Sequence, residues 1–113
     1  MLEIDHKEIE PGVEVITIAG RVMLGPDSQR IEAVVHELLG QGRKKIIFDL
    51  SGVTHIDSTG IGRFIAALNM VMAAQGVMFI AGAQGQVREG FRVTRLDTIF
   101  RFFDGLEAAP AAR

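Results

Sequence analysis

The sequence predicts an α/β fold, a mostly parallel sheet of four to five strands that is opened by an antiparallel hairpin and packed with helices. Two runs rich in β-branched and aromatic residues, 45–50 and 77–81, are typical of buried strands. Between them lies the apolar stripe of an amphipathic helix, with the three-and-four spacing of Ile61, Phe64, Ile65, Leu68 and Met72. The 113 residues suffice for one hydrophobic core and not for two, so a single domain over 1–113 is expected.

The first elements are predicted to form the hairpin. Residues 2–10 largely alternate between apolar and polar, Pro11-Gly12 is a turn signal, and 13–18 is a second strand-forming run. Because the turn is short, the two strands should pair antiparallel. A loop at 20–25 then leads to Pro26, which suits the first turn of a helix that ends at Gly40.

Strands and helices alternate along the rest of the chain. The strand at 45–50 is followed by a helix over 61–72 and then by the strand at 77–81. Residues 84–93 predict a short helix that two glycines weaken, and 99–103 is the last strand candidate. From Asp104 onward a short helix should fade into a loosely ordered tail over 104–113. Parallel strands in this order imply right-handed crossovers.

Composition excludes several classes of protein. The net charge of −2 argues against direct nucleic-acid binding, which needs clustered Lys and Arg. With no Cys, there is neither a disulfide framework nor a thiolate metal site. Hydrophobic residues make up 48% of the chain, but no apolar run approaches the roughly 20 residues of a membrane helix. The N-terminus lacks a signal-peptide pattern, so a cytoplasmic protein without membrane insertion is expected.

Charged residues are unevenly distributed. From Ser51 to Val87, the only Asp, Glu, Lys or Arg residues are Asp57 and Arg63. A helix at the surface of so small a domain normally carries a charged outer face. Part of this surface is therefore expected to meet another protein.

The spacing of the candidate residues does not match that of known catalytic or cofactor-binding motifs. His55, Asp57 and Ser58 supply the residue types of a hydrolase triad, but one short loop cannot easily place an imidazole between the other two groups. The run 60–62 lacks the third glycine and the later acidic residue of a dinucleotide fingerprint, and no Gly-Lys-Ser/Thr phosphate loop occurs. The three histidines are scattered, so we predict no metal site, no cofactor and no enzymatic activity.

The stretch 55–62 lies where the central helix is expected to begin. Side-chain oxygens of Asp57, Ser58 and Thr59 can accept from free backbone N–H groups of the first turn, and the plain interpretation is that Ser58 is the N-cap. Gly60 and Gly62, however, cost helix propensity and suggest that something approaches the backbone closely. Such a junction offers a hydroxyl beside a carboxylate at the positive end of a helix dipole, where a phosphate can be added and removed.

The run Ile56-Asp57-Ser58-Thr59-Gly60-Ile61-Gly62 resembles the signature of the STAS domain, in particular that of bacterial anti-sigma factor antagonists. The resemblance covers nearly the whole chain. It includes the hairpin that ends at Gly20, the helix that ends near Gly40, the run 46–53 that leads into the signature, and the strand at 77–81.

The resemblance implies a switch without catalysis. In this family the serine after the aspartate, here Ser58 with Thr59 as the weaker candidate, is phosphorylated with ATP by an anti-sigma factor of histidine-kinase-like ATPase fold. The unphosphorylated form would bind that serine kinase and free the sigma factor, and a PP2C-type phosphatase would reset it. The expected contact surface is the loop 20–25, the signature and the exposed side of the helix that follows. Its named residues are Arg21, Met23, Asp57, Ser58, Thr59, Gly60, Ile61, Gly62, Arg63, Phe64 and Ala67, with Asn69 further along the helix.

One loop departs from the family pattern. The family commonly carries Gly-x-Leu-Asp after its second strand, whereas Met23 stands here where the aspartate is expected. With Arg21 nearby, the rim of the site should be less negative. An alternative therefore stays open: a constitutive STAS interaction or scaffold module, such as a stressosome-type or lipid-transport accessory subunit, that phosphorylation does not regulate.

Overall fold

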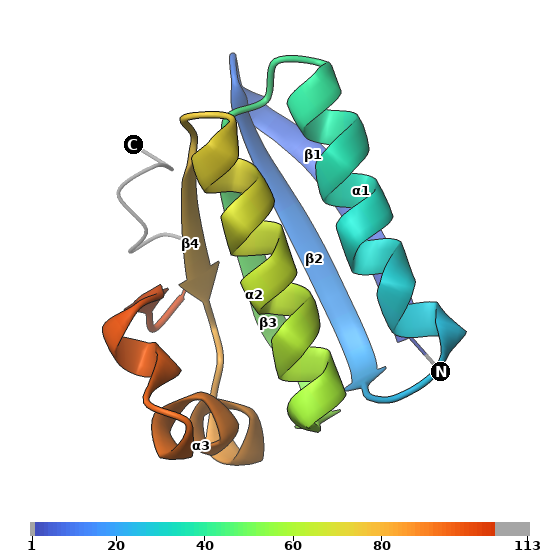
Figure 1. The fold of residues 1–113 in the computed structure, drawn as a ribbon, viewed down its shortest axis with the longest axis vertical. Helices are drawn as coiled ribbons and strands as arrows, with labels where there is room; N and C mark the ends of the chain where they lie inside the picture. Colours follow the sequence, from blue (N-terminus) through green and yellow to red (C-terminus); the bar gives the residue numbers. More distant parts are fainter. Residues whose placement is uncertain (1, 106–113) are drawn as a thin grey trace.

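Five strands form one sheet in which each strand lies beside the strand that precedes it in the chain (Figure 1). The computed structural model describes residues 2–105, with Asp97 by its backbone alone. Its elements are β1 (Leu2–Glu10), β2 (Val13–Val22), the 3₁₀ turn η1 (Pro26–Ser28), α1 (Gln29–Gly40), β3 (Lys45–Ile56), α2 (Ser58–Ala73), β4 (Val77–Ala81), α3 (Gly85–Val93), the 3₁₀ turn η2 (Leu96–Thr98) and β5 (Arg101–Phe103). β1 and β2 pair antiparallel, and all later neighbours pair parallel. The predicted α/β fold is confirmed.

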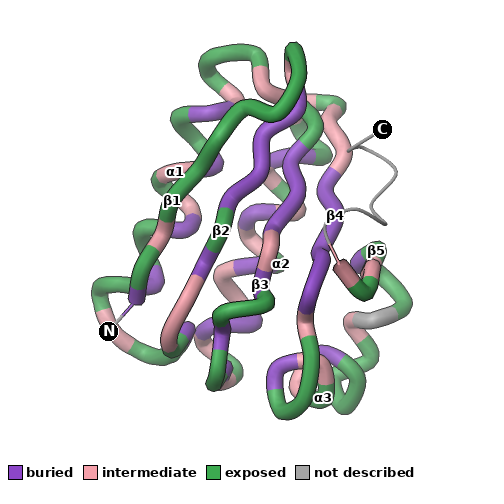
Figure 2. Tube along the Cα trace, turned by 180° about the vertical axis from the view of Figure 1, so that it is seen from behind, coloured by how far each residue is buried: buried purple, intermediate pink, exposed green. Residues whose placement is uncertain are grey.

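The helices cover one face of the sheet, and the strands face the viewer when the molecule is seen from behind (Figures 1 and 2). The main core fills the space between the helices and the sheet. Phe64 of α2 lies at its centre, with its ring centroid 5.2 Å from that of Phe48 on β3 and 5.9 Å from that of Phe91 on α3. These edge-on aromatic contacts fix α2, which begins at Ser58, against both neighbours.

The opposite face of the sheet carries a second, smaller apolar cluster. Its buried members are Val13, Val15, Ile47, Phe79 and Ala81. Each occupies the odd position of its strand, whereas the main core takes the even positions of the same strand segments, as the period of two in a strand requires. Both faces of the central strands are therefore buried, which explains why they read as continuous apolar runs.

β3 is longer than the sequence pattern predicted. The expected strand ended at residue 50, but pairing with β2 continues to Ile56. Two register shifts each leave one extra residue on β3, and these bulges break the alternation by which a strand is recognised. Gly52 permits the close pairing there, because an added Cβ would lie only 2.9 Å from the Cβ of Ala19.

Three smaller differences concern the other elements. β2 extends to Val22, so the loop expected at 20–25 begins only at Met23. α3 forms despite its glycines, because a Cβ on Gly90 would stand 3.2 Å from Ile56 and the glycine lets the helix approach. The short helix expected from Asp104 onward falls mainly on 106–113, outside the described residues.

Candidate functional site

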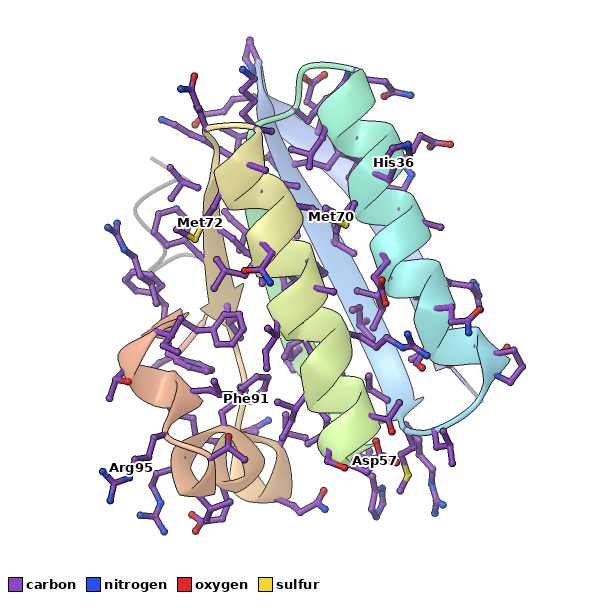
Figure 3. All side chains as sticks on the ribbon, viewed as in Figure 1. His36, Asp57, Met70, Met72, Phe91 and Arg95 are labelled. Atoms are coloured by element: carbon purple, nitrogen blue, oxygen red, sulfur yellow. The ribbon has the colours of Figure 1, made fainter. Side chains whose placement is uncertain are left out.

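The candidate site lies where β2 and β3 end side by side. Val22 and Ile56 are paired at these strand ends, and the backbone N–H of Asp57 donates to the carbonyl oxygen of Val22 at 3.3 Å. From this point the chain leaves β2 into the 23–25 loop and leaves β3 into α2. Asp57 therefore marks the N-terminal end of α2, at the bottom of the view in Figure 3. The carboxyl ends of parallel strands are where α/β proteins most often place their functional groups.

Asp57 joins the start of α2 to the loop after β2. Its Oδ1 accepts a hydrogen bond from the backbone N–H of Gly60 at 2.8 Å, which caps the helix. Its Oδ2 accepts from the backbone N–H of Leu24, also at 2.8 Å. One carboxylate therefore fixes two segments of chain that lie 33 residues apart in the sequence.

The same contacts keep Asp57 ionised. Partial burial raises the pKa of its carboxyl group, but the hydrogen bonds from Gly60 and Leu24 outweigh this effect, so the pKa lies below its ordinary value of 3.8. At neutral pH a fixed negative charge therefore lies next to the first residue of α2.

Ser58 is that first residue, and its side chain is exposed. The interpretation of Ser58 as the N-cap is wrong, because Asp57 supplies the capping oxygen. Within residues 2–105 the hydroxyl of Ser58 makes no hydrogen bond, whereas the neighbouring Thr59 is half-buried. The helix therefore does not need the Ser58 hydroxyl, which is open to solvent and to a modifying enzyme.

The two glycines of the signature differ in what surrounds them. A Cβ on Gly60 would lie 2.0 Å from the carbonyl oxygen of Val22 and 2.9 Å from a side-chain carbon of Ile56, so the first turn of α2 packs directly on the end of β2. The expectation of a close approach is confirmed at Gly60. At Gly62 it is wrong for the chain itself, because no atom lies within 4 Å of the position of a Cβ.

Two residues of the predicted contact set are in the core. Phe64 and Ala67 were expected on the exposed side of α2, but both have 0% exposed surface. That expectation is wrong, because the face of α2 that carries Phe64 packs against β3 and α3. Ile61 is also buried, with 6% of its surface exposed. A partner could reach Phe64 or Ala67 only by opening the main core.

A different row of residues forms the outer stripe of α2, which we define as Ser58, Gly62, Ile65, Asn69 and Met72. They recur at intervals of three and four, and none of them is charged. Met72 has 63% of its surface exposed and Ile65 has 36%. Sequence reasoning assigned these two to the buried stripe and missed them, although the shortage of charge between residues 51 and 87 was the signal that pointed to this face.

The loop after β2 adds an apolar tip beside the stripe. Leu24 has 80% of its surface exposed, and Met23 has 36%. The loop borders a cavity of about 340 Å³ that is lined by Leu2, Arg21, Met23, Leu24, Gly25, Pro26 and Asp27. The predicted contact surface included the loop 20–25 as a whole, but Leu24 was not named in it, because nothing in the pattern distinguished it from the rest of the loop.

Arg63 is held by two neighbours on the preceding helical segment. Its Nε donates to Ser28 Oγ at 3.1 Å, and a terminal nitrogen of its guanidinium donates to Glu32 Oε1 at 3.0 Å. Arg63 therefore links α2 to η1 and α1. Among the other predicted contact residues, Arg21, Met23 and Ser58 are exposed, Asp57, Thr59 and Gly62 are half-buried, and Gly60 is buried.

Residues 2–105 show neither a metal site nor a membrane span. No group of three or more His, Cys, Asp or Glu side chains in this range could hold a metal ion. His6 instead contacts the buried Glu14, with 2.6 Å between Nδ1 and Oε2. No helix in the same range is long and apolar enough to cross a membrane.

Comparison with known proteins places this geometry among related folds. The STAS domain family model matches residues 6–109. The anti-sigma-B factor antagonist of Staphylococcus aureus is 26% identical over 77 residues, which cover 68% of this chain and 71% of that protein. An anti-sigma factor antagonist from Mycobacterium paratuberculosis superposes with a TM-score of 0.80 at 18% identity, covering 95% of this chain and 89% of the other. The Bacillus cell fate determinant SpoIIAA in its phosphorylated form gives 0.75 at 19% identity, covering 98% and 100%. The two structural likenesses concern the fold.

Proposed function

Because the chain belongs to the STAS domain family, we propose that it is an anti-sigma factor antagonist that is switched at Ser58. In the unphosphorylated state it binds an anti-sigma factor and releases the sigma factor. The anti-sigma factor is a serine kinase of histidine-kinase-like ATPase fold, which phosphorylates Ser58 and thereby ends the binding. A PP2C-type phosphatase restores the hydroxyl. The chain itself performs no catalysis.

The observation that carries this proposal is the division of roles between Asp57 and Ser58. Asp57 caps α2 and also holds the loop after β2, so the structure does not depend on the Ser58 hydroxyl. Phosphorylation can therefore alter the surface of the protein without removing a contact that stabilises its fold. The positive end of the α2 dipole also partly stabilises the added phosphate.

The phosphate acts as a switch through its charge. It adds about −1.5 to −2 charges next to the ionised carboxylate of Asp57. A partner that covers Ser58 would have to desolvate both groups. A penalty of about 3 kcal/mol would weaken binding roughly a hundredfold, which is enough to reverse the partner's preference.

The proposed contact surface combines the exposed tip of the loop after β2 with the outer stripe of α2. The stripe is uncharged and contains Ile65 and Met72, and the tip contains Met23 and Leu24. Apolar residues on the same face as a single modifiable group suit a protein partner whose binding depends on the state of that group. Gly62 leaves open space in which a partner's backbone could approach α2.

A constitutive interaction module is the second candidate, and the composition of the loop favours it. Met23 replaces the acidic residue of the family pattern, and Arg21 is exposed on the same rim. In that case the same surface binds a scaffold or a transport assembly, and Ser58 is never modified.

Titration of partner binding separates the two candidates. Ser58→Asp should weaken binding of the anti-sigma factor by about a hundredfold, while Ser58→Ala retains it. Gln86→Asp is the matched control, since it adds the same charge at an exposed position in the first turn of α3 and should leave affinity within about twofold. Mass spectrometry of the protein incubated with partner and ATP should place phosphate on Ser58. Unchanged affinity of Ser58→Asp together with no phosphate would establish the constitutive module instead.

A further inference from the structure

The segment 23–28 is tied to α2 at two separate points. At its start, the backbone N–H of Leu24 donates to Asp57. At its end, Ser28 Oγ accepts from Arg63 and donates to the carbonyl oxygen of Gly25 at 3.2 Å. Ser28 is 1% exposed, so this hydroxyl is satisfied inside the protein and not by water.

The chain between the two ties takes a conformation that few residue types allow. Gly25 adopts φ 144°, a value that side chains rarely allow, and the ring of Pro26 fixes the next φ. Leu24 therefore projects outward from a segment that is anchored on both sides. Because 80% of its surface is exposed, the Leu24 side chain contributes almost no burial free energy to the stability of the fold.

We infer that Arg63 is a positioning residue for the partner surface. Through Ser28 and Glu32 it holds the segment 23–28 against α2, so that Leu24 is presented beside Ser58 as the apolar side chain that enters a pocket of the partner. This rests on the proposed function for the existence of the partner, but not for the link between Arg63 and Leu24.

The geometry of the guanidinium suits this role. Its planar fork reaches two acceptors on two consecutive elements, Ser28 on η1 and Glu32 on α1, at 3.1 and 3.0 Å. The Arg63 and Glu32 side chains are 23% and 34% exposed, so solvent screens the pair only in part. A segment that is already ordered loses less entropy when a partner binds it, so a fixed Leu24 binds more tightly than a mobile one.

Hydrogen exchange of the Leu24 amide tests the link in the absence of any partner. NMR on the labelled full chain gives the exchange rate of this amide relative to that of Phe48 on the central strand. Arg63→Gln should raise that ratio about threefold, and Glu32→Gln should raise it by less, because the contact with Ser28 remains. Arg43→Gln is the matched control: it removes another half-buried arginine, which pairs with two glutamates beyond the other end of α1.

The control should not raise the ratio: any loss of global stability speeds exchange at Phe48, which opens with the whole domain, and leaves the local opening at Leu24 unchanged. A ratio that is equal in wild type and in Arg63→Gln overturns the inference, whatever partner is eventually found. A ratio that rises equally in Arg43→Gln also overturns it, because the effect would then be general loosening and not a specific tie between Arg63 and the segment 23–28.

Partner binding supplies the second readout. Leu24→Ala should weaken binding of the anti-sigma factor about tenfold and Arg63→Gln about fivefold. The double variant should be little weaker than Leu24→Ala alone, because Arg63 acts through Leu24; additive losses contradict that mechanism. Failure of the proposed function looks different. If no anti-sigma factor binds the wild type, the proposed switch fails, while the exchange ratio still decides the role of Arg63.

Discussion

Replacing Gly60 by alanine places a methyl group where the backbone of β2 already lies. The added Cβ would be 2.0 Å from the carbonyl oxygen of Val22, 2.8 Å from its carbonyl carbon and 2.9 Å from Ile56 Cγ1. The first two atoms belong to a paired strand and cannot rotate away as the end of a side chain can. The start of α2 must therefore move, and the move disturbs the contacts that Asp57 makes with Leu24 and with residue 60 itself.

The expected cost follows from two opposing terms. Overpacking of a closely packed site costs about 1–3 kcal/mol, and a clash with backbone belongs at the upper end of that range. Alanine in place of glycine in a helix returns about 1 kcal/mol. The free energy of unfolding should therefore fall by about 2 kcal/mol, which corresponds to a Tm lower by about 8 °C for a domain of this size.

Gly62→Ala is the matched control two residues further along the same helix. No atom lies within 4 Å of its Cβ position, so only the propensity term applies. This variant should gain about 0.5–1 kcal/mol and melt a few degrees higher. The two substitutions are chemically identical and should shift stability in opposite directions.

Far-UV circular dichroism during thermal and urea unfolding measures both shifts. The chain has no Trp and no Tyr, so intrinsic fluorescence is a poor probe and circular dichroism is the better one. If Gly60→Ala is as stable as the wild type, or if both variants shift in the same direction, α2 does not pack on the end of β2 as described and the geometry of the site is wrong.

Three further predictions follow from the same contacts. The stability that Asp57 contributes is fully present above the ordinary carboxyl pKa of 3.8 and is lost as pH falls through the lower pKa of the folded state. NMR titration of the Leu24 amide should therefore give a midpoint below 3.8. A midpoint at or above 3.8 would contradict the hydrogen bonds from Gly60 and Leu24 to Asp57. Arg43→Gln removes a cation beside the buried carboxylate of Glu14 and should lower the urea-derived free energy of unfolding by about 1–3 kcal/mol, whereas no loss would mean that the pair contributes nothing. Gly62→Ala, though more stable, should weaken partner binding in the same titration, and full affinity would place the partner elsewhere.

The fold could be predicted well from the sequence wherever the apolar residues follow a single regular spacing, that of a strand or that of a helix. The strands at 45–50 and 77–81 and the amphipathic helices gave the sheet and its direction, because burial on one or both faces leaves a direct trace in the order of apolar residues. The second half of β3 left no such trace. Its two bulges shift the side-chain alternation, so residues 51–56 resembled a loop although they pair with β2.

The candidate site was predicted in part, for physical reasons that differ by residue. A run of oxygen-bearing side chains indicates where a helix begins, but it does not show which of these side chains is the N-cap. In the structure the N-cap is Asp57 and not Ser58. The sequence pattern also did not predict which face of α2 packs on the core, because Phe64 and Ile65 are both apolar and only Phe64 is buried. Contacts between distant segments, such as Asp57 with Leu24, have no local signature at all.

The order of strands in the sheet has a consequence for how the protein is made. Because the spatial order β1 to β5 repeats the order in the chain, each strand can pair with one that has already left the ribosome. Ser58, Asp57 and Leu24 are all synthesised before β4, α3 and β5. The aromatic ring of Phe91, which packs against Phe64 beneath the site, arrives more than twenty residues after them. A nascent or truncated chain thus displays the serine before the surface around it is rigid, and the complete recognition surface belongs to the finished molecule alone.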